Sequence, residues 1–146
     1  MVDTMQAIRL TGPGGYDALT ISEVPKPSLE PGWVLIGVKA FGVNESEVTS
    51  RRGESGPDFA FPRILGIECA GVIDAAAPES RFSPGQQVVT MMGGMGRAID
   101  GSYAEYVLVR EENVIPSSSE SALGDDRCAA GDVPDRLWVP DHRPGA

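Results

Sequence analysis

The apolar residues of this chain fall in short runs that turn residues interrupt, and this pattern predicts a mainly β fold. Residues 6–10 contain three apolar residues and are expected to form a first strand, and residues 19–24 alternate apolar and polar positions, as half-buried strands do. A glycine- and proline-containing turn at residues 11–15 separates the two runs. We therefore expect the second strand to pair back on the first.

The longest strand-like run covers residues 33–43. It is apolar on both faces in places, so we expect it in the centre of a sheet. Gly37 in its middle predicts a bulge or a sharp bend. Turn signals at regular spacing separate further expected strands, which lie at residues 71–77, 87–92, 103–109 and 113–116. Such a series is typical of a barrel or a sandwich.

One short helix interrupts the strands. Asn44 is a helix N-cap residue, and Glu47 stands three positions later, where a capping box has its acid. Gly53 is placed to end the helix. This spacing predicts a helix over residues 45–52.

Residues 61–71 carry one carboxylate, Glu68, among apolar neighbours, with a turn expected at Gly66. A lone acid in such a setting needs a hydrogen-bond partner, a shifted pKa or access to water. A structural role, as a hydrogen-bonded acid at a corner between strands, stays open here beside a functional one.

Length and charge narrow the function classes. The 146 residues are enough for one domain with a core, and 18 glycines and 12 prolines agree with many turns. The net charge of −9 and the absence of a basic cluster exclude an ordinary nucleic-acid surface. No apolar run approaches the length that spans a membrane, so we expect no membrane partner.

The two cysteines, Cys69 and Cys128, stand far apart in unlike contexts. They form neither a disulfide framework nor a zinc-finger spacing. A reducing, cytoplasmic location is the simplest account. We interpret Cys69 as a small buried apolar residue.

The glycine-rich residues 93–96 could suggest a phosphate-binding loop. They lack the G-x-G-x-x-G spacing and a following amphipathic helix, so a mobile rim to a cleft is the better interpretation. Several nearby side chains are interpreted as packing residues of the strands and their connections: Met91, Met92, Met95, Tyr103 and Tyr106.

The chain also carries an ordered series of motifs: Gln6-Ala7-Ile8, Gly12-Pro13-Gly14-Gly15, Pro31-Gly32, Val34-Leu35-Ile36, Gly42-Val43-Asn44, Phe61-Pro62, Leu65-Gly66-Ile67-Glu68, Gly71-Val72-Ile73 and Gly101-Ser102-Tyr103-Ala104-Glu105-Tyr106. Taken in order, they resemble the N-terminal, GroES-like domain of the medium-chain dehydrogenase/reductases. The likeness is to the zinc-free branch that includes the quinone oxidoreductases, and it covers residues 5 to about 116. The resemblance implies a GroES-like, partly open β-barrel with one or two short helices.

The resemblance also bears on zinc. In the zinc-dependent branch a cysteine stands where this chain has Asn44, and a histidine where it has Ile67. Neither residue is a zinc ligand, and Glu68 alone makes no site. The cysteine-rich lobe that holds a structural zinc is absent too. The resemblance therefore implies that the chain binds no metal.

The resemblance to the zinc-free branch implies an NADPH-dependent reductase of quinones or activated double bonds. The partner implied for the intact family is therefore a small-molecule quinone or enone. Hydride would pass from the nicotinamide to an electron-poor carbon in the cleft between two domains. The resemblance places Asn44 on the nicotinamide side of that cleft, as a cofactor-binding candidate compatible with its role as N-cap. It identifies no catalytic residue.

After about residue 116 the resemblance stops. A family member continues into a Rossmann domain with a glycine-rich dinucleotide loop. Here the last 30 residues, 117–146, are rich in Asp, Arg, Pro and Gly. Plausible codons for residues 123–145, read one nucleotide later, encode SGTIGALPEMFQTAYGSLTTG. That string resembles the segment with which this family enters its Rossmann domain, so we infer a frameshift near residues 123–125.

This interpretation divides the chain into a leader (1–4), a GroES-like domain (5–122) and an irregular, out-of-frame tail (123–146). His142 would be a solvated tail residue rather than a general base. We expect a truncated oxidoreductase that retains the substrate-side domain, lacks its own cofactor and is inactive alone. Self-association into a homo-oligomer through exposed apolar surface is a further expectation. The alternatives are a stand-alone GroES-like binding or structural module with no cofactor, and a defective product with no function.

Overall fold

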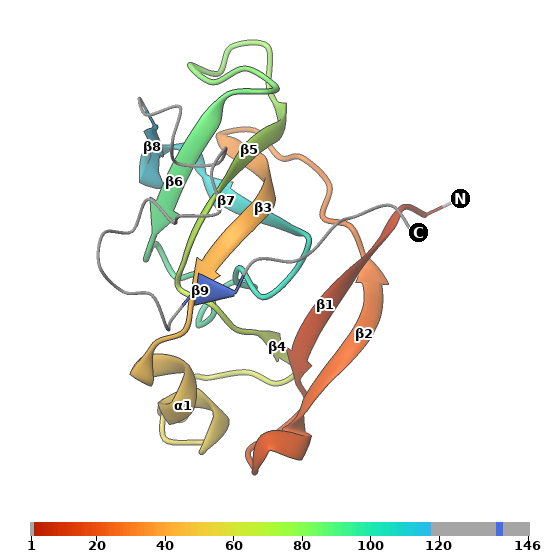
Figure 1. Cartoon of the computed structure of the whole chain (residues 1–146), viewed down its shortest axis with the longest axis vertical. Coiled ribbons are helices and arrows are strands. Elements are labelled where there is room, and N and C mark those ends of the chain that lie inside the picture. The colour runs from red at the N-terminus through yellow and green to blue at the C-terminus, as the bar shows by residue number, and fades with distance from the viewer. Residues whose placement is uncertain (1, 118–136, 139–146) are drawn as a thin grey trace.

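The structure is a computed structural model that describes residues 2–117 and 137–138. Figure 1 shows a β-hairpin beside a larger sheet, with the single α-helix of the described part at one end. The elements in chain order are β1 (Thr4–Leu10), η1 (Tyr16–Ala18), β2 (Leu19–Pro25), β3 (Trp33–Gly42), α1 (Glu45–Arg51), β4 (Arg63–Ile64), β5 (Glu68–Ala76), β6 (Gln87–Met91), β7 (Tyr106–Arg110), η2 (Glu111–Asn113), β8 (Val114–Pro116) and β9 (Leu137–Trp138).

The first sheet has the order β2-β1-β4. β1 and β2 pair antiparallel along their whole length, from Thr4 opposite Pro25 to Leu10 opposite Leu19. The apolar side of β1 is buried, and Leu10 is fully excluded from solvent. The predicted hairpin is therefore confirmed, with β1 beginning two residues earlier than expected.

The second sheet has the order β7-β3-β5-β6-β8, so β3 lies inside it, as its apolar faces predicted. The pairing of β3 with β5 shifts register between Leu35 and Ile36 and again between Val38 and Ala40. The irregularities thus flank Gly37 rather than fall on it. The close approach is made by the partner strand, because a Cβ on Gly71 would contact the Gly37 carbonyl oxygen and Ile36.

The two sheets are not closed into one barrel, and together they form the mainly β, partly open GroES-like barrel that the sequence predicted. A short stretch of backbone pairing between residues 103–104 and β1 holds the two sheets together. The Ile8 N–H donates to the Tyr103 carbonyl at 2.8 Å, and Ala7 forms a β-bridge with Ala104. Apolar side chains from both sheets fill the interior between them.

Because of this pairing, the predicted start of one strand is wrong. β7 begins at Tyr106 rather than at Tyr103. Residues 103–105 instead pair with β1, where the Glu105 N–H donates to the Gln6 carbonyl at 3.1 Å. The interpretation of the three methionines as packing residues is also only partly right. Met95 is 1% exposed, but Met91 and Met92 are 53% and 61% exposed.

Most of the predicted tail, including His142, lies outside the described residues. The exception is β9, whose Trp138 and Leu137 pair antiparallel with Phe41 and Gly42 of β3. The boundaries proposed for leader, domain and tail stay a prediction. Within the described part of the chain, no helix has the length and apolar character needed to cross a membrane.

Candidate functional site

The candidate site begins where β3 ends and α1 starts. A capping box opens the helix, as predicted, and the Glu47 carboxylate accepts the Asn44 backbone N–H at 2.7 Å. The other Glu47 oxygen accepts the N–H of Ile67 at 3.3 Å. α1 ends at Arg51, and Gly53 follows in the left-handed conformation with φ of 78°. Glu47 thus fixes the helix start to the segment that leads into β5.

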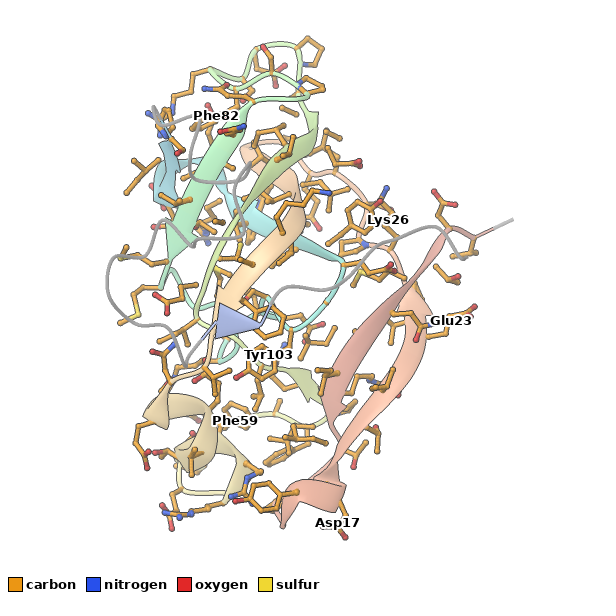
Figure 2. The ribbon with its side chains drawn as sticks, in the orientation of Figure 1. Asp17, Glu23, Lys26, Phe59, Phe82 and Tyr103 are labelled. Atoms are coloured by element: carbon orange, nitrogen blue, oxygen red, sulfur yellow. The ribbon has the colours of Figure 1, made fainter. Side chains whose placement is uncertain are left out.

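Glu47 is a buried acid, 5% exposed. Burial raises the pKa of its carboxyl above the ordinary value of 4.5, and hydrogen bonds from the Asn44 and Ile67 amides act in the opposite direction. Tyr103 lies nearby, and burial together with the Glu47 charge raises the pKa of its phenol. Figure 2 shows Tyr103 beneath the end of β3, where its ring stacks on Phe41 with centroids 4.5 Å apart.

The second acid, Glu68, bonds the Asn44 side chain. Nδ2 of Asn44 donates to Oε1 of Glu68 at 3.1 Å. The Glu68 backbone is held in turn, because Ser102 Oγ donates to its carbonyl at 2.7 Å. Gly42 makes room for this arrangement, since a Cβ there would contact Glu68 Oε1. The acid that the sequence left without a partner therefore has one.

Together these contacts hold a half-buried amide in one place. Glu47 bonds the Asn44 main chain and Glu68 bonds its side chain. An amide offers hydrogen bonds at neutral charge and does not titrate. Asn44 is therefore suited to orient the polar end of a ligand rather than to transfer a proton.

Exposed apolar residues border this polar pair. Met91 lies opposite Glu68 in the ladder between β5 and β6, and the Met92 N–H donates to the Ile67 carbonyl at 2.7 Å. Val43, next to Asn44, is 46% exposed. We call Val43, Met91 and Met92 the apolar rim.

The glycine-rich residues 93–96 follow the rim directly. Gly93, Gly94 and Gly96 all have positive φ. Between this loop and residue 117 there is no α-helix, so the loop does not have the strand-turn-helix order of a dinucleotide site. Whether the loop is mobile stays a prediction.

No metal centre is found among the described residues, where no three His, Cys, Asp or Glu side chains form a group that could hold an ion. The sequence predicts that zinc does not bind because Asn44 and Ile67 are not zinc ligands. This stays a prediction. Cys69 is buried as interpreted, and burial raises the pKa of its thiol to about 12. A thiol with that pKa is unreactive at neutral pH.

A separate groove of about 510 Å³ lies between the β1–β2 hairpin and β7. Its walls include Glu23, Val24, Ile64 and Tyr106, and Glu23 can be followed in Figure 2. Neither Asn44 nor the apolar rim contributes to it. The groove and the candidate site are therefore different surfaces.

The sequence identified Asn44, Glu47 and Glu68 but did not bring all three together. It predicted the capping bond from Glu47, yet not the second bond of Glu47 to Ile67 or the pairing of Asn44 with Glu68. Gly42 was the available signal, because a glycine directly beside a strand end can admit another side chain. Asn44 as a cofactor-binding residue stays a prediction.

Comparisons with known proteins agree with this fold. The family model for the alcohol dehydrogenase GroES-like domain matches residues 30–119. A quinone oxidoreductase of Lama guanicoe is 35% identical over 112 residues, which are 75% of this chain and 32% of that protein. A trans-enoyl reductase of Aspergillus sclerotiorum is 29% identical over 112 residues, or 74% of this chain and 30% of that protein.

Among solved structures, a thermostable alcohol dehydrogenase from Pyrobaculum aerophilum has a TM-score of 0.71 at 29% identity. The similarity covers 81% of this chain and 42% of that one. The chain spans about a third of the length of the curated relatives it matches. The matched family model covers most of the residues that build the barrel and the Asn44–Glu68 pair. The chain therefore belongs to the alcohol dehydrogenase GroES-like domain family, within the medium-chain dehydrogenase/reductases.

Proposed function

We propose that the chain is the substrate-side domain of an NADPH-dependent oxidoreductase of the quinone reductase-like type. Family membership gives the oxidoreductase class. The observation that carries the proposal is the Asn44 amide, which Glu68 holds beside the apolar rim. A fixed hydrogen-bonding group next to exposed apolar side chains suits a flat ring with polar substituents.

In this proposal Asn44 orients the nicotinamide end of the cofactor. A quinone or enone then receives hydride at an electron-poor carbon, in agreement with the names of the relatives, a quinone oxidoreductase and a trans-enoyl reductase. The cofactor supplies the hydride, and the protein supplies binding, orientation and exclusion of water. The proposal includes a zinc-free reaction and a cytoplasmic location.

Beyond the nicotinamide end, the described residues do not provide a binding site for the remainder of a dinucleotide. A pyrophosphate site needs a glycine-rich turn between a strand and a helix N-terminus. The single α-helix of the described part, α1, has seven residues and follows Asn44 rather than a glycine-rich turn. We therefore propose that this chain alone neither binds NADPH tightly nor reduces quinones.

We propose further that residues from about 123 onward are translated out of frame. In the other frame, codons compatible with residues 123–145 encode a string similar to the family's inter-domain segment. The in-frame continuation would supply the dinucleotide domain. Sequencing the coding DNA through the codons for residues 123–125 and beyond tests this directly. Absence of a dinucleotide-binding sequence in the alternative frame would refute it.

The decisive functional experiment deletes one nucleotide at those codons and expresses the longer product. We expect NADPH-dependent reduction of a quinone or an enone by this product and no activity from the present chain. Replacing Asn44 by Ala in the longer product should reduce kcat/KM by roughly tenfold or more, the effect of one lost oriented hydrogen bond. The matched control Glu23→Gln, in the separate groove, should leave activity unchanged. An inactive long product, or an unaffected Asn44→Ala variant, would contradict the proposal.

A further inference from the structure

Met92 has an unusual backbone conformation for a residue with a side chain. Its φ is 62°, and it is the one non-glycine residue with positive φ in the part of the chain that the structure describes. This left-handed conformation brings the Cβ of an L-residue too close to the following carbonyl oxygen, so residues other than glycine seldom adopt it. Glycine has no Cβ and adopts it freely. A methionine here therefore costs folding free energy that a glycine would not.

The surrounding main chain holds residue 92 in this conformation. The Met92 N–H donates to the Ile67 carbonyl at 2.7 Å, and the Met92 carbonyl accepts the Met95 N–H at 3.1 Å. The second bond closes a turn whose two central residues, Gly93 and Gly94, also have positive φ. A glycine at position 92 could make the same main-chain bonds. These bonds thus explain the conformation of residue 92 but not the presence of a side chain there.

Burial of the Met92 side chain does not offset the strain. Met92 is 61% exposed, whereas Met95 is 1% exposed and belongs to the core. The chain therefore keeps a large apolar side chain on a strained backbone without the gain that burial would bring. Strained residues of this kind cluster at active sites and at sites that hold ligands.

Hydrogen bonds place Met92 against the candidate site. Ile67, whose carbonyl accepts the Met92 N–H, donates its own N–H to the Glu47 carboxylate. The Glu47 carboxylate also accepts the Asn44 N–H. This series of bonds fixes the backbone of residue 92 relative to the backbone of Asn44.

We propose that Met92 is a specificity-determining residue of the candidate site, and that its thioether packs against the ring of a quinone. This role rests on the proposed function, which brings such a ring beside Asn44. Methionine suits the contact because its side chain is unbranched and its polarisable sulfur interacts favourably with flat aromatic rings. The conjugated ring of a quinone presents a similar face, and an acyclic enone presents none. Met92 therefore favours quinones over acyclic enones as substrates.

Two substitutions at position 92 separate the strain from the contact. Met92→Gly removes both the Cβ and the thioether, and should raise the urea midpoint of the chain. Met92→Ala keeps the Cβ and should leave the midpoint unchanged. The matched control Met91→Gly, at the end of β6, should lower the midpoint because glycine weakens a strand. A midpoint for Met92→Gly that is unchanged or lower would overturn the proposal, since the strain would then be absent or the side chain would stabilise the fold.

Nuclear magnetic resonance on the present chain tests the contact without a cofactor. The probe is duroquinone, whose fully substituted ring does not add to thiols. In protein with isotope-labelled methionine methyl groups, the Met92 signal should shift as duroquinone is added. The signals of Met5 and Met95, which are buried, should stay in place. A Met92 signal that moves no more than that of Met95, up to the solubility limit of duroquinone, would overturn the proposal.

Kinetics of the longer product test the specificity. Met92→Gly and Met92→Ala should each raise KM for duroquinone roughly threefold to tenfold with kcat nearly unchanged, the effect of one lost sulfur–ring contact. KM for the acyclic enone mesityl oxide should change by less than about twofold. Glu23→Gln, in the separate groove, should leave both KM values unchanged. Equal increases for the two substrates would overturn the assigned specificity.

The same measurements separate this role from the proposed function. An active longer product whose Met92 variants keep the KM for duroquinone would overturn the role of Met92 alone. An inactive longer product would contradict the proposed function, and the duroquinone titration of the present chain would still decide whether Met92 contacts the ring.

Discussion

Asn44 and Glu68 are 24 residues apart in sequence, and Nδ2 of Asn44 donates a hydrogen bond to Oε1 of Glu68 at 3.1 Å. One residue caps α1 and the other opens β5, so this bond connects the start of the helix to the sheet. Gly42 gives the carboxylate the space it occupies. The same bond holds the amide that we propose contacts the nicotinamide.

Replacing Asn44 by Ala should lower the free energy of unfolding by about 1 kcal/mol, because the helix loses its N-cap side chain. Glu68→Gln keeps a side-chain carbonyl that can accept the Asn44 amide, and should change stability by less than about 0.5 kcal/mol. Urea denaturation monitored by circular dichroism measures both. Equal losses in the two variants would mean that the Glu68 charge, rather than its acceptor oxygen, is what Asn44 requires.

Gly66→Ala should be severely destabilising. Gly66 has φ of 104°, and a Cβ there would contact Ser102 Oγ and the Tyr103 ring. Strain and overlap together should reduce the free energy of unfolding by more than about 2 kcal/mol. The control Gly12→Ala, at a position with open space for a Cβ, should be neutral within about 0.5 kcal/mol. An unchanged urea midpoint for the Gly66→Ala protein would contradict this prediction and would show that residues 101–103 move to accommodate the added methyl group.

Glu47 predicts a pH dependence of stability. Burial raises its pKa in the folded state above 4.5, so the folded chain holds this proton more tightly than the unfolded chain does. Its contribution to stability is then fully present below about pH 4.5 and is lost as the pH rises through the folded pKa. Glu47→Gln lacks this titration, so the stability of the unaltered chain relative to the variant should fall as the pH is raised from 4 to 7, along roughly that window.

Urea midpoints of both proteins at several pH values across this window give the difference directly. Comparing the two proteins cancels the other acids, whose titration they share. A difference that grows with pH, or stays constant, would contradict a raised pKa for Glu47.

We expect no stoichiometric zinc in the purified chain. Asn44 and Ile67 stand at the two positions that supply a cysteine and a histidine in the zinc-dependent branch, and zinc requires Cys, His or carboxylate ligands. Metal analysis of protein purified without chelator should show background amounts only. One tightly held zinc ion per chain would refute this expectation.

Local patterns predicted the elements that local physics determines. The alternation in residues 19–24 predicted β2, and Asn44 with Gly53 predicted the start of α1 and its end to within one residue. These features are determined by residues that lie close together in the sequence. Glu68 stands out in the sequence for the same reason, because a lone acid among apolar residues is unusual on its own.

Features set by distant contacts were missed. β7 was extended back to Tyr103, because its residues are strand-like and nothing nearby shows that 103–105 pair with β1 instead. Met91 and Met92 were interpreted as packing residues, yet hydrophobicity does not say which face a side chain takes at the end of a strand. The Asn44–Glu68 bond joins the N-cap of α1 to the first residue of β5, so neither segment alone indicates it.

The central proposal is that this chain forms one side of an active site and that a separate domain binds the cofactor. Hydride transfer needs the two reacting carbons held near contact, and a half site leaves the nicotinamide in water. Titrating NADPH into the purified chain while its tryptophan fluorescence is followed, and then assaying quinone-dependent NADPH oxidation, tests this most directly. The account predicts neither saturable binding in the micromolar range nor turnover. Saturable micromolar binding accompanied by quinone reduction would contradict it.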